Sequence, residues 1–239
     1  MTKEPDSILG LPGQWLTRSD IVTSIARLSD GLIFAGKLLL DTKTNQSYQL
    51  DLYEHDPDLV RAFALAGRRS LTESDLAAID AHTHTLYVIG TGGSGERAKL
   101  LMQIGTRLLH AGGLAVKVES TGVAHSLTDW QTLTAASELS ALYYAYVTLI
   151  GDHERFYSCG MHNLGLPDAI IPGTLLPNQA AQLLETFLLY LLLEQPSLKQ
   201  GHTFSVDAQG PRYRLRFAPC TLYETDDPFY NPYGMWMLE

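Results

Sequence analysis

The chain has 239 residues, of which 45% are hydrophobic and 18% are charged, and this composition is that of a globular protein that can bury a core without disulfides. Its net charge of −9 is opposite in sign to that of a general nucleic-acid binder, so we expect no nucleic-acid partner. The longest apolar stretch, residues 180–193, is too short and too polar to cross a bilayer, and the N-terminal residues lack a signal-peptide pattern. Two cysteines form no disulfide framework, so we expect a cytoplasmic protein without membrane contact.

Residues 1–13 are polar and carry Pro and Gly, and we expect them to form a loosely held tail. Apolar spacing and capping residues then predict helices over residues 19–28, 57–66, 72–79, 96–110, 129–149 and 179–193. Strands are predicted between these helices, over residues 32–40, 48–53, 85–89, 114–119 and 155–159, with a closing hairpin of residues 204–206 and 213–217. The aromatic C-terminal tail, residues 226–239, is expected to be irregular and to pack back over the sheet.

This order of elements predicts an α/β (α+β) fold, in which a mixed β-sheet is flanked by helices in a compact sandwich. We expect a single compact domain over residues 1–239, or two packed lobes with a seam near residues 71–84, where the pattern is weakest.

A glycine-rich loop offers the first candidate site. Gly90, Gly92 and Gly95 complete a G-x-G-x-x-G pattern between a predicted strand and a predicted helix, which is the context of a dinucleotide-binding loop. Glu119, at the end of the next strand, would bind the ribose. However, Glu96 opens the helix and would repel a phosphate there. An ordinary glycine-rich turn between strand and helix explains the pattern better, and we expect no cofactor.

Two polar segments, residues 119–126 and 158–168, offer the second candidate site. Cys159 could act as a thiol nucleophile with His125 or His162 as its base, and Glu119 or Asp168 would then orient the base. The C-x-x-H spacing of Cys159 and His162 could also hold zinc, together with His125 or with the pair His82 and His84. No standard catalytic or metal motif is complete, so we expect structural roles for these side chains and no metal. If strands 114–119 and 155–159 are sheet neighbours, both loops emerge at the same edge.

These segments also carry a resemblance. Residues 11–15 (LPGQW), 54–57 (EHDP), 113–126 (GLAVKVESTGVAHS) and 158–168 (SCGMHNLGLPD) are similar to the bacterial domain of unknown function 4261 family. The resemblance implies no established activity and supplies no catalytic residues. Small acidic bacterial proteins of this kind are often partners in interbacterial toxin systems, including those of type VI secretion, so the analogy implies an immunity (antitoxin) protein.

The function that we expect is therefore that of a non-enzymatic protein-binding protein, which neutralises a basic toxin by direct contact. A net negative charge would favour such a basic partner through electrostatic steering. Two alternatives stay open at this point. One is a hydrolase-type enzyme that uses Glu119, His125, Cys159 and His162, and the other is a dinucleotide-binding protein that uses the glycine loop of residues 90–95. The sequence leaves the oligomeric state open.

Overall fold

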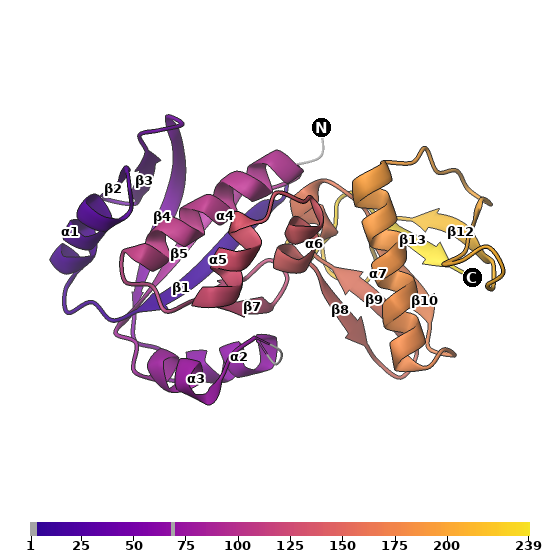
Figure 1. Ribbon diagram of the computed structural model, residues 1–239, viewed down its shortest axis with the longest axis horizontal. Coiled ribbons are helices and arrows are strands. Elements are labelled where there is room, and N and C mark those ends of the chain that lie inside the picture. The colour runs from indigo at the N-terminus through magenta and orange to yellow at the C-terminus, as the bar shows by residue number, and fades with distance from the viewer. Residues whose placement is uncertain (1–3, 68–69) are drawn as a thin grey trace.

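Residues 4–67 and 70–239 are described by a computed structural model, in which two β-sheets stand beside each other along the longest axis (Figure 1). The first sheet has the strand order β2-β3-β4-β5-β1-β6-β7, and all its neighbours are antiparallel. Its strands are β1 (Asp6–Gly13), β2 (Leu32–Ala35), β3 (Leu38–Asp41), β4 (Gln46–Glu54), β5 (His84–Thr91), β6 (Ala115–Val118) and β7 (Val123–Ser126).

The second sheet has the strand order β11-β12-β13-β10-β9-β8 and is mixed, because β10 and β13 run parallel while its other neighbours are antiparallel. Its strands are β8 (Thr148–Gly151), β9 (Arg155–Cys159), β10 (Asp168–Pro172), β11 (Thr203–Phe204), β12 (Tyr213–Ala218) and β13 (Met235–Leu238). The predicted α/β fold with a mixed sheet and flanking helices is thus confirmed, with two sheets in place of one.

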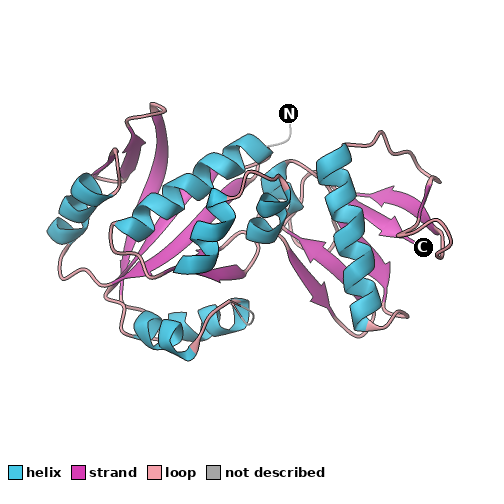
Figure 2. Cartoon of the chain, viewed as in Figure 1, coloured by secondary structure: helices cyan, strands magenta, loops and turns pink. Residues whose placement is uncertain are grey.

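The helices cover the sheets unevenly (Figure 2). They are α1 (Arg18–Leu28), α2 (Leu59–Ala66), α3 (Glu73–Asp80), α4 (Gly95–His110), α5 (Leu127–Ala135), α6 (Ser140–Tyr146), α7 (Pro177–Glu194) and the 3-10 turn η1 (Met161–Leu164). Helix α4 lies on one face of the first sheet, over β1 and β5, while α2 and α3 form a small separate core with Ala115 and Ala124. Helix α7 packs on one face of the second sheet (Figure 1).

One buried hydrophobic cluster extends from the first sheet to the second. It includes Leu9 of β1, Tyr146 of α6 and Phe187 of α7, each of them 0% exposed. The Tyr146 hydroxyl donates to the carbonyl of Ala98 in α4 at 2.8 Å, so α6 is fixed between the two sheets. Residues 71–84, where a seam was predicted, hold α3 and the entry to β5, whereas the chain passes from the first sheet to the second between β7 and β8.

The predicted N-terminal tail is in fact an internal strand from Asp6 on, so that prediction was wrong, whereas the C-terminal tail is irregular over residues 226–234 as predicted and ends in a second internal strand. Strand β1 lies between β5 and β6, and its residues Leu9 and Leu11 are completely buried (residues 1–3 fall outside the described residues). Strand β13 lies between β10 and β12, where its Met235 and Trp236 are buried. Each of these short segments is held by a strand on either side, and such long-range pairing overrides the weak local signal of Pro and Gly.

Two further boundaries differ from the prediction. Residues 32–40 form the hairpin of β2 and β3, which turns at Gly36 with a φ of +65°. Residues 129–149 divide into α5, α6 and the start of β8, because Ala136 leaves the helix with an extended backbone. The short strands β7 and β10, which border the two polar segments, were not predicted.

Candidate functional site

The two polar segments do meet, although their strands belong to different sheets. Strand β6 is in the first sheet and β9 is in the second, so the condition that they are sheet neighbours is not met. The contact is made by the loops that follow them: Ser120 Oγ donates to Asn163 Oδ1 at 3.0 Å, and Ser7 of β1 donates to the same oxygen. Ser120 and Asn163 are each 0% exposed, so their hydrogen bonds tie β1, the β6–β7 loop and η1 together inside the protein.

Asp168, at the start of β10, is the centre of a second buried group of hydrogen bonds. Its carboxylate accepts from Ser158 Oγ at 2.7 Å, from Asn231 Nδ2 at 2.6 Å and from the Met161 backbone N–H at 3.3 Å. Burial raises the pKa of Asp168 to about 6, although these hydrogen bonds act in the opposite direction. The carboxyl group is 2% exposed, so it braces β9, η1 and the C-terminal segment and has no access to a substrate in solution.

Cys159 lies at the end of β9 with 1% of its surface exposed. Burial raises the pKa of its thiol, and the neighbouring Asp168 adds to this effect. Its Sγ lies 3.9 Å from the carbonyl oxygen of Phe229. Since the thiolate is the nucleophilic form, these surroundings favour an inert thiol.

The two candidate histidines are also inside the protein and have separate surroundings. His125 Nε2 donates to the Ala145 carbonyl at 3.0 Å and its ring packs against Trp130, while burial lowers its pKa. His162 is 0% exposed, and burial lowers its pKa to about 4. Its Nε2 accepts from Asn163 at 3.3 Å, and its Nδ1 has no hydrogen-bond partner among the described residues.

Glu119 lies on the opposite face of the first sheet from His125. His125 pairs with Val116 and faces the core, whereas Glu119 follows Lys117 by two residues and forms an ion pair with it. The other carboxylate oxygen, Oε1, is buried without a partner among the described residues. The first sheet therefore separates Glu119 from His125, while Cys159 lies in β9 of the second sheet and His162 in η1.

Part of the glycine loop is hydrogen-bonded to other parts of the protein. The Gly92 N–H donates to the Pro5 carbonyl at 2.8 Å, and the Gly93 N–H donates to the Asn163 carbonyl at 3.1 Å. Ser94 caps α4 by accepting from the Arg97 N–H at 3.3 Å. Three of the N–H groups that a pyrophosphate could use, those of Gly92, Gly93 and Arg97, are thus bound to protein carbonyls or to the cap.

No three His, Cys, Asp or Glu side chains within residues 4–67 and 70–239 are grouped so that they could hold a metal ion. His82 Nδ1 is bonded to the Ile79 carbonyl and His84 Nδ1 to that of Trp15, so these two rings hold separate backbone segments. Nor does any helix in the same residues have the length and apolarity to cross a membrane.

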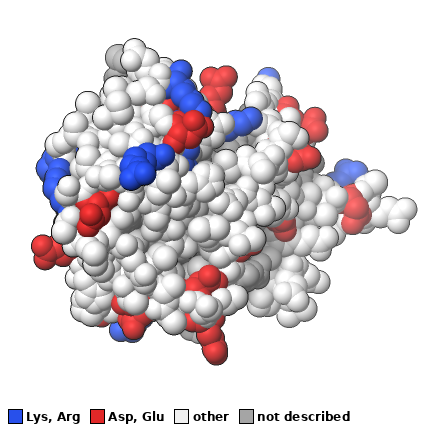
Figure 3. Space-filling view, turned by 60° about the vertical axis from the view of Figure 1, so that its left-hand side comes forward, with Lys and Arg blue, Asp and Glu red and all other residues white. Residues whose placement is uncertain are grey.

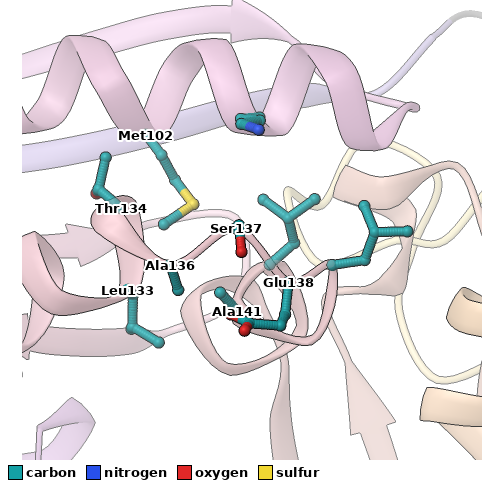
Figure 4. A pocket seen from close by; sticks show the side chains of 10 residues that line it. Met102, Leu133, Thr134, Ala136, Ser137, Glu138 and Ala141 are labelled. Atoms are coloured by element: carbon teal, nitrogen blue, oxygen red, sulfur yellow. The ribbon is translucent and has the colours of Figure 1, made fainter.

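The cavities lie away from the candidate residues. Figure 4 shows one between α4 and the α5–α6 connection, lined by Met102, Leu133, Thr134, Ala136, Ser137, Glu138 and Ala141 among others. It holds about 20 Å³, which is room for one water molecule. A second, open hollow of about 430 Å³ lies beside Tyr190, His202 and Phe204. Neither is lined by Glu119, His125, Cys159 or His162.

Sequence reasoning found Asp168 and Ser158 but missed Ser7 and Asn231, which complete the two buried hydrogen-bond groups. Both lie in segments that were predicted to be irregular tails. The apolar alternation around Ser7, with buried Leu9 and Leu11 two and four residues later, was the signal that could have revealed β1.

The comparisons with known proteins agree with the predicted resemblance. The model of the family described as Domain of unknown function (DUF4261) matches residues 157–239. No curated protein matches the chain, and no solved structure does. From β9 to the C-terminal strand β13, the chain is therefore similar to this family of unknown function.

Proposed function

We propose that this protein acts by binding another protein and not by catalysis, as a bacterial immunity protein that neutralises a basic toxin by direct contact. A cytoplasmic location and a toxin delivered by type VI secretion are part of the same proposal. The observation that carries it is the burial of the candidate catalytic side chains Cys159, His125 and His162.

A catalytic thiol or imidazole must reach a substrate and change its protonation state near neutral pH. Cys159 and His162 are 1% and 0% exposed, and burial holds both in their neutral forms. His125 is 7% exposed and its Nε2 is occupied by a backbone carbonyl. These surroundings support a structural role for the polar segments, which leaves binding as the function to test.

The glycine loop gives the dinucleotide alternative little support either, since the N–H groups of Gly92 and Gly93 bond to the carbonyls of Pro5 and Asn163. The net charge of −9 supports a basic partner, because complementary charge speeds the encounter of two proteins. Figure 3 shows acidic and basic side chains intermixed over the face in view, with wide uncharged areas between them. The binding surface must therefore be sought from the shape and burial of particular elements.

The test is to co-express the chain with the product of the adjacent gene and to purify the complex. We expect a stable one-to-one complex, and rescue of bacterial growth when that product is toxic. Variants Cys159→Ala and His125→Gln, if they remain folded, should bind and protect as the unaltered chain does. The absence of any complex with adjacent-gene products, or loss of protection in folded Cys159→Ala with binding intact, would contradict the proposal.

A further inference from the structure

The second sheet has one face covered by α7 and one face covered only in part, where residues 219–231 lie over buried Cys159 and Asp168. Helix α7 packs on the side that carries buried Ile171, Leu215 and Leu238. On the other side, the strand register places five residues in one row across β8, β9, β10, β13 and β12, and none of them is buried: Ile150, Tyr157, Ile170, Met237 and Arg216. We call these five residues the open row. Four of them are large and apolar or aromatic, so a row about 19 Å long remains partly in contact with water.

One end of this face is bordered by the acidic loop, which we define as residues 219–231. Its Tyr223 hydroxyl lies 3.5 Å from that of Tyr157, so the loop is in contact with the open row. The loop carries three exposed carboxylates, and residues 217–239 contain no Lys or Arg. The exposed carboxylates are those of Glu224, Asp226 and Asp227.

The remaining borders are closer to neutral. Arg155 is paired with Asp152 and Glu154 in the β8–β9 turn, and Arg216 is paired with Glu239 at 3.0 Å. Arg214 of β12 is exposed on the same side as Arg216. The excess of negative charge is therefore largest at the loop border, and cations of a partner would be placed there.

We propose that the open row and the acidic loop form the surface that binds the basic partner protein, with apolar side chains of the partner on the row and its Lys or Arg side chains at the loop. This inference rests on the proposed function. A flat face of this length, containing Tyr, Met and Arg, has the composition of a protein interface and no enclosed volume for a small molecule. Four of the five strands of the row lie within residues 157–239 in whole or in large part.

The apolar contribution is tested with Ile150→Thr together with Met237→Gln, which reduce apolar contact without changing charge. The matched control is Leu176→Gln with Leu193→Gln, since these residues are 66% and 48% exposed beside α7, on the covered side of the sheet. Binding of the adjacent-gene product is measured by calorimetry. We expect the open-row variant to weaken binding by about tenfold or more. The control variant should stay within about twofold.

The electrostatic contribution is tested with Glu224→Lys together with Asp226→Lys. The control, Glu138→Lys with Glu194→Lys, makes the same change in net charge at exposed residues elsewhere. Because the charge at the interface steers association, we expect the loop variant to slow association and to lose most of its salt dependence. The control variant should change the association rate and its salt dependence much less.

A measurement on the unaltered chain tests the same surface without the risk that a variant misfolds. On complex formation the methyl resonance of Met237 should shift, while those of the buried Met102 and Met161 should not. Equal binding by the open-row and control variants, or an unshifted Met237 in a formed complex, would overturn the inference while leaving the proposed function intact. A dimer of the chain that the open-row variant abolishes would assign the face to a second copy and overturn it too. If no complex forms at all, the proposed function fails, and the inference fails with it.

Discussion

Among single residues, Asp168 and His162 respond to burial in opposite ways. Burial raises the pKa of Asp168 to about 6 from 3.8, against hydrogen bonds from Asn231 and Ser158. Burial lowers the pKa of His162 to about 4 from 6.5. Between about pH 4 and pH 6, Asp168 is therefore protonated in the folded protein but ionised in the unfolded chain. In the same range His162 is neutral in the folded protein but protonated in the unfolded chain.

The signs of the two effects on stability follow directly. The stability linked to Asp168 is complete below pH 3.8 and is lost as the pH rises through about 6, a difference of ~3 kcal/mol. The stability linked to His162 is complete above pH 6.5 and is lost as the pH falls through about 4, also by ~3 kcal/mol. Between pH 4 and pH 6 the two largely cancel.

We predict that the variant Asp168→Asn will show the pH dependence of stability that His162 alone produces, because the opposing contribution of Asp168 is removed. The variant loses the hydrogen bond from Asn231 and is less stable than the unaltered protein, but its free energy of unfolding should rise with pH from about 4 to 6.5. Urea unfolding at several pH values measures this. His162→Leu is the control and should show the reverse slope. Parallel pH profiles for Asp168→Asn and the unaltered protein would show that the carboxyl group does not titrate as described.

Among the elements, the turn η1 determines how the candidate segments meet. Gly160 precedes it with a φ of +127°, and a Cβ there would overlap the Tyr146 carbonyl oxygen at the end of α6. Gly165 follows it with a φ of +78°, and a Cβ there would overlap the Gly93 carbonyl oxygen in the glycine loop. Both ends of η1 are thus in backbone contact with other elements, and close packing is a sufficient reason for glycine in this part of the chain.

We predict that Gly160→Ala costs more than about 3 kcal/mol, since it combines a disfavoured φ with a steric clash that backbone atoms cannot relieve. Gly36→Ala is the matched control, because Gly36 has a φ of +65° and no atom within 4 Å of the added Cβ. It should cost about 1 kcal/mol from its backbone conformation alone. Denaturant unfolding compares the two variants, and equal losses would argue against the clash at Tyr146.

For the whole molecule, the shared core predicts how the protein unfolds. One buried cluster includes residues of both sheets, and α6 contacts α4 on one side and α7 on the other. We therefore predict one cooperative transition, with equal calorimetric and van't Hoff enthalpies. Differential scanning calorimetry measures this. Two resolved transitions would mean that the sheets are independent units, in contrast to the single domain expected from the sequence.

The sequence predicted those elements that are stabilised by contacts between residues close together in the chain. The cap of α3 is an example, because Thr72 and Asp75 exchange hydrogen bonds within one turn of helix. Strand β13 had no such signal and β1 had only its apolar alternation, since both are fixed by partners far away in the sequence. The same holds for the site. Two-residue periodicity puts Glu119 and Lys117 on one face, but the approach of Asn163 to Ser120 depends on how the two sheets pack.

The sequence alone determined the alternation of helices and strands, the resemblance to a family of unknown function and the presence of two polar segments. These depend on spacing and composition, which act over a few residues. Only the tertiary structure decided that Cys159 and His162 are buried, that Glu119 lies across a sheet from His125, and that the second sheet keeps part of one face in contact with water. Burial and pairing depend on contacts between distant segments, and the chemistry of a thiol, an imidazole or a carboxylate follows from those contacts.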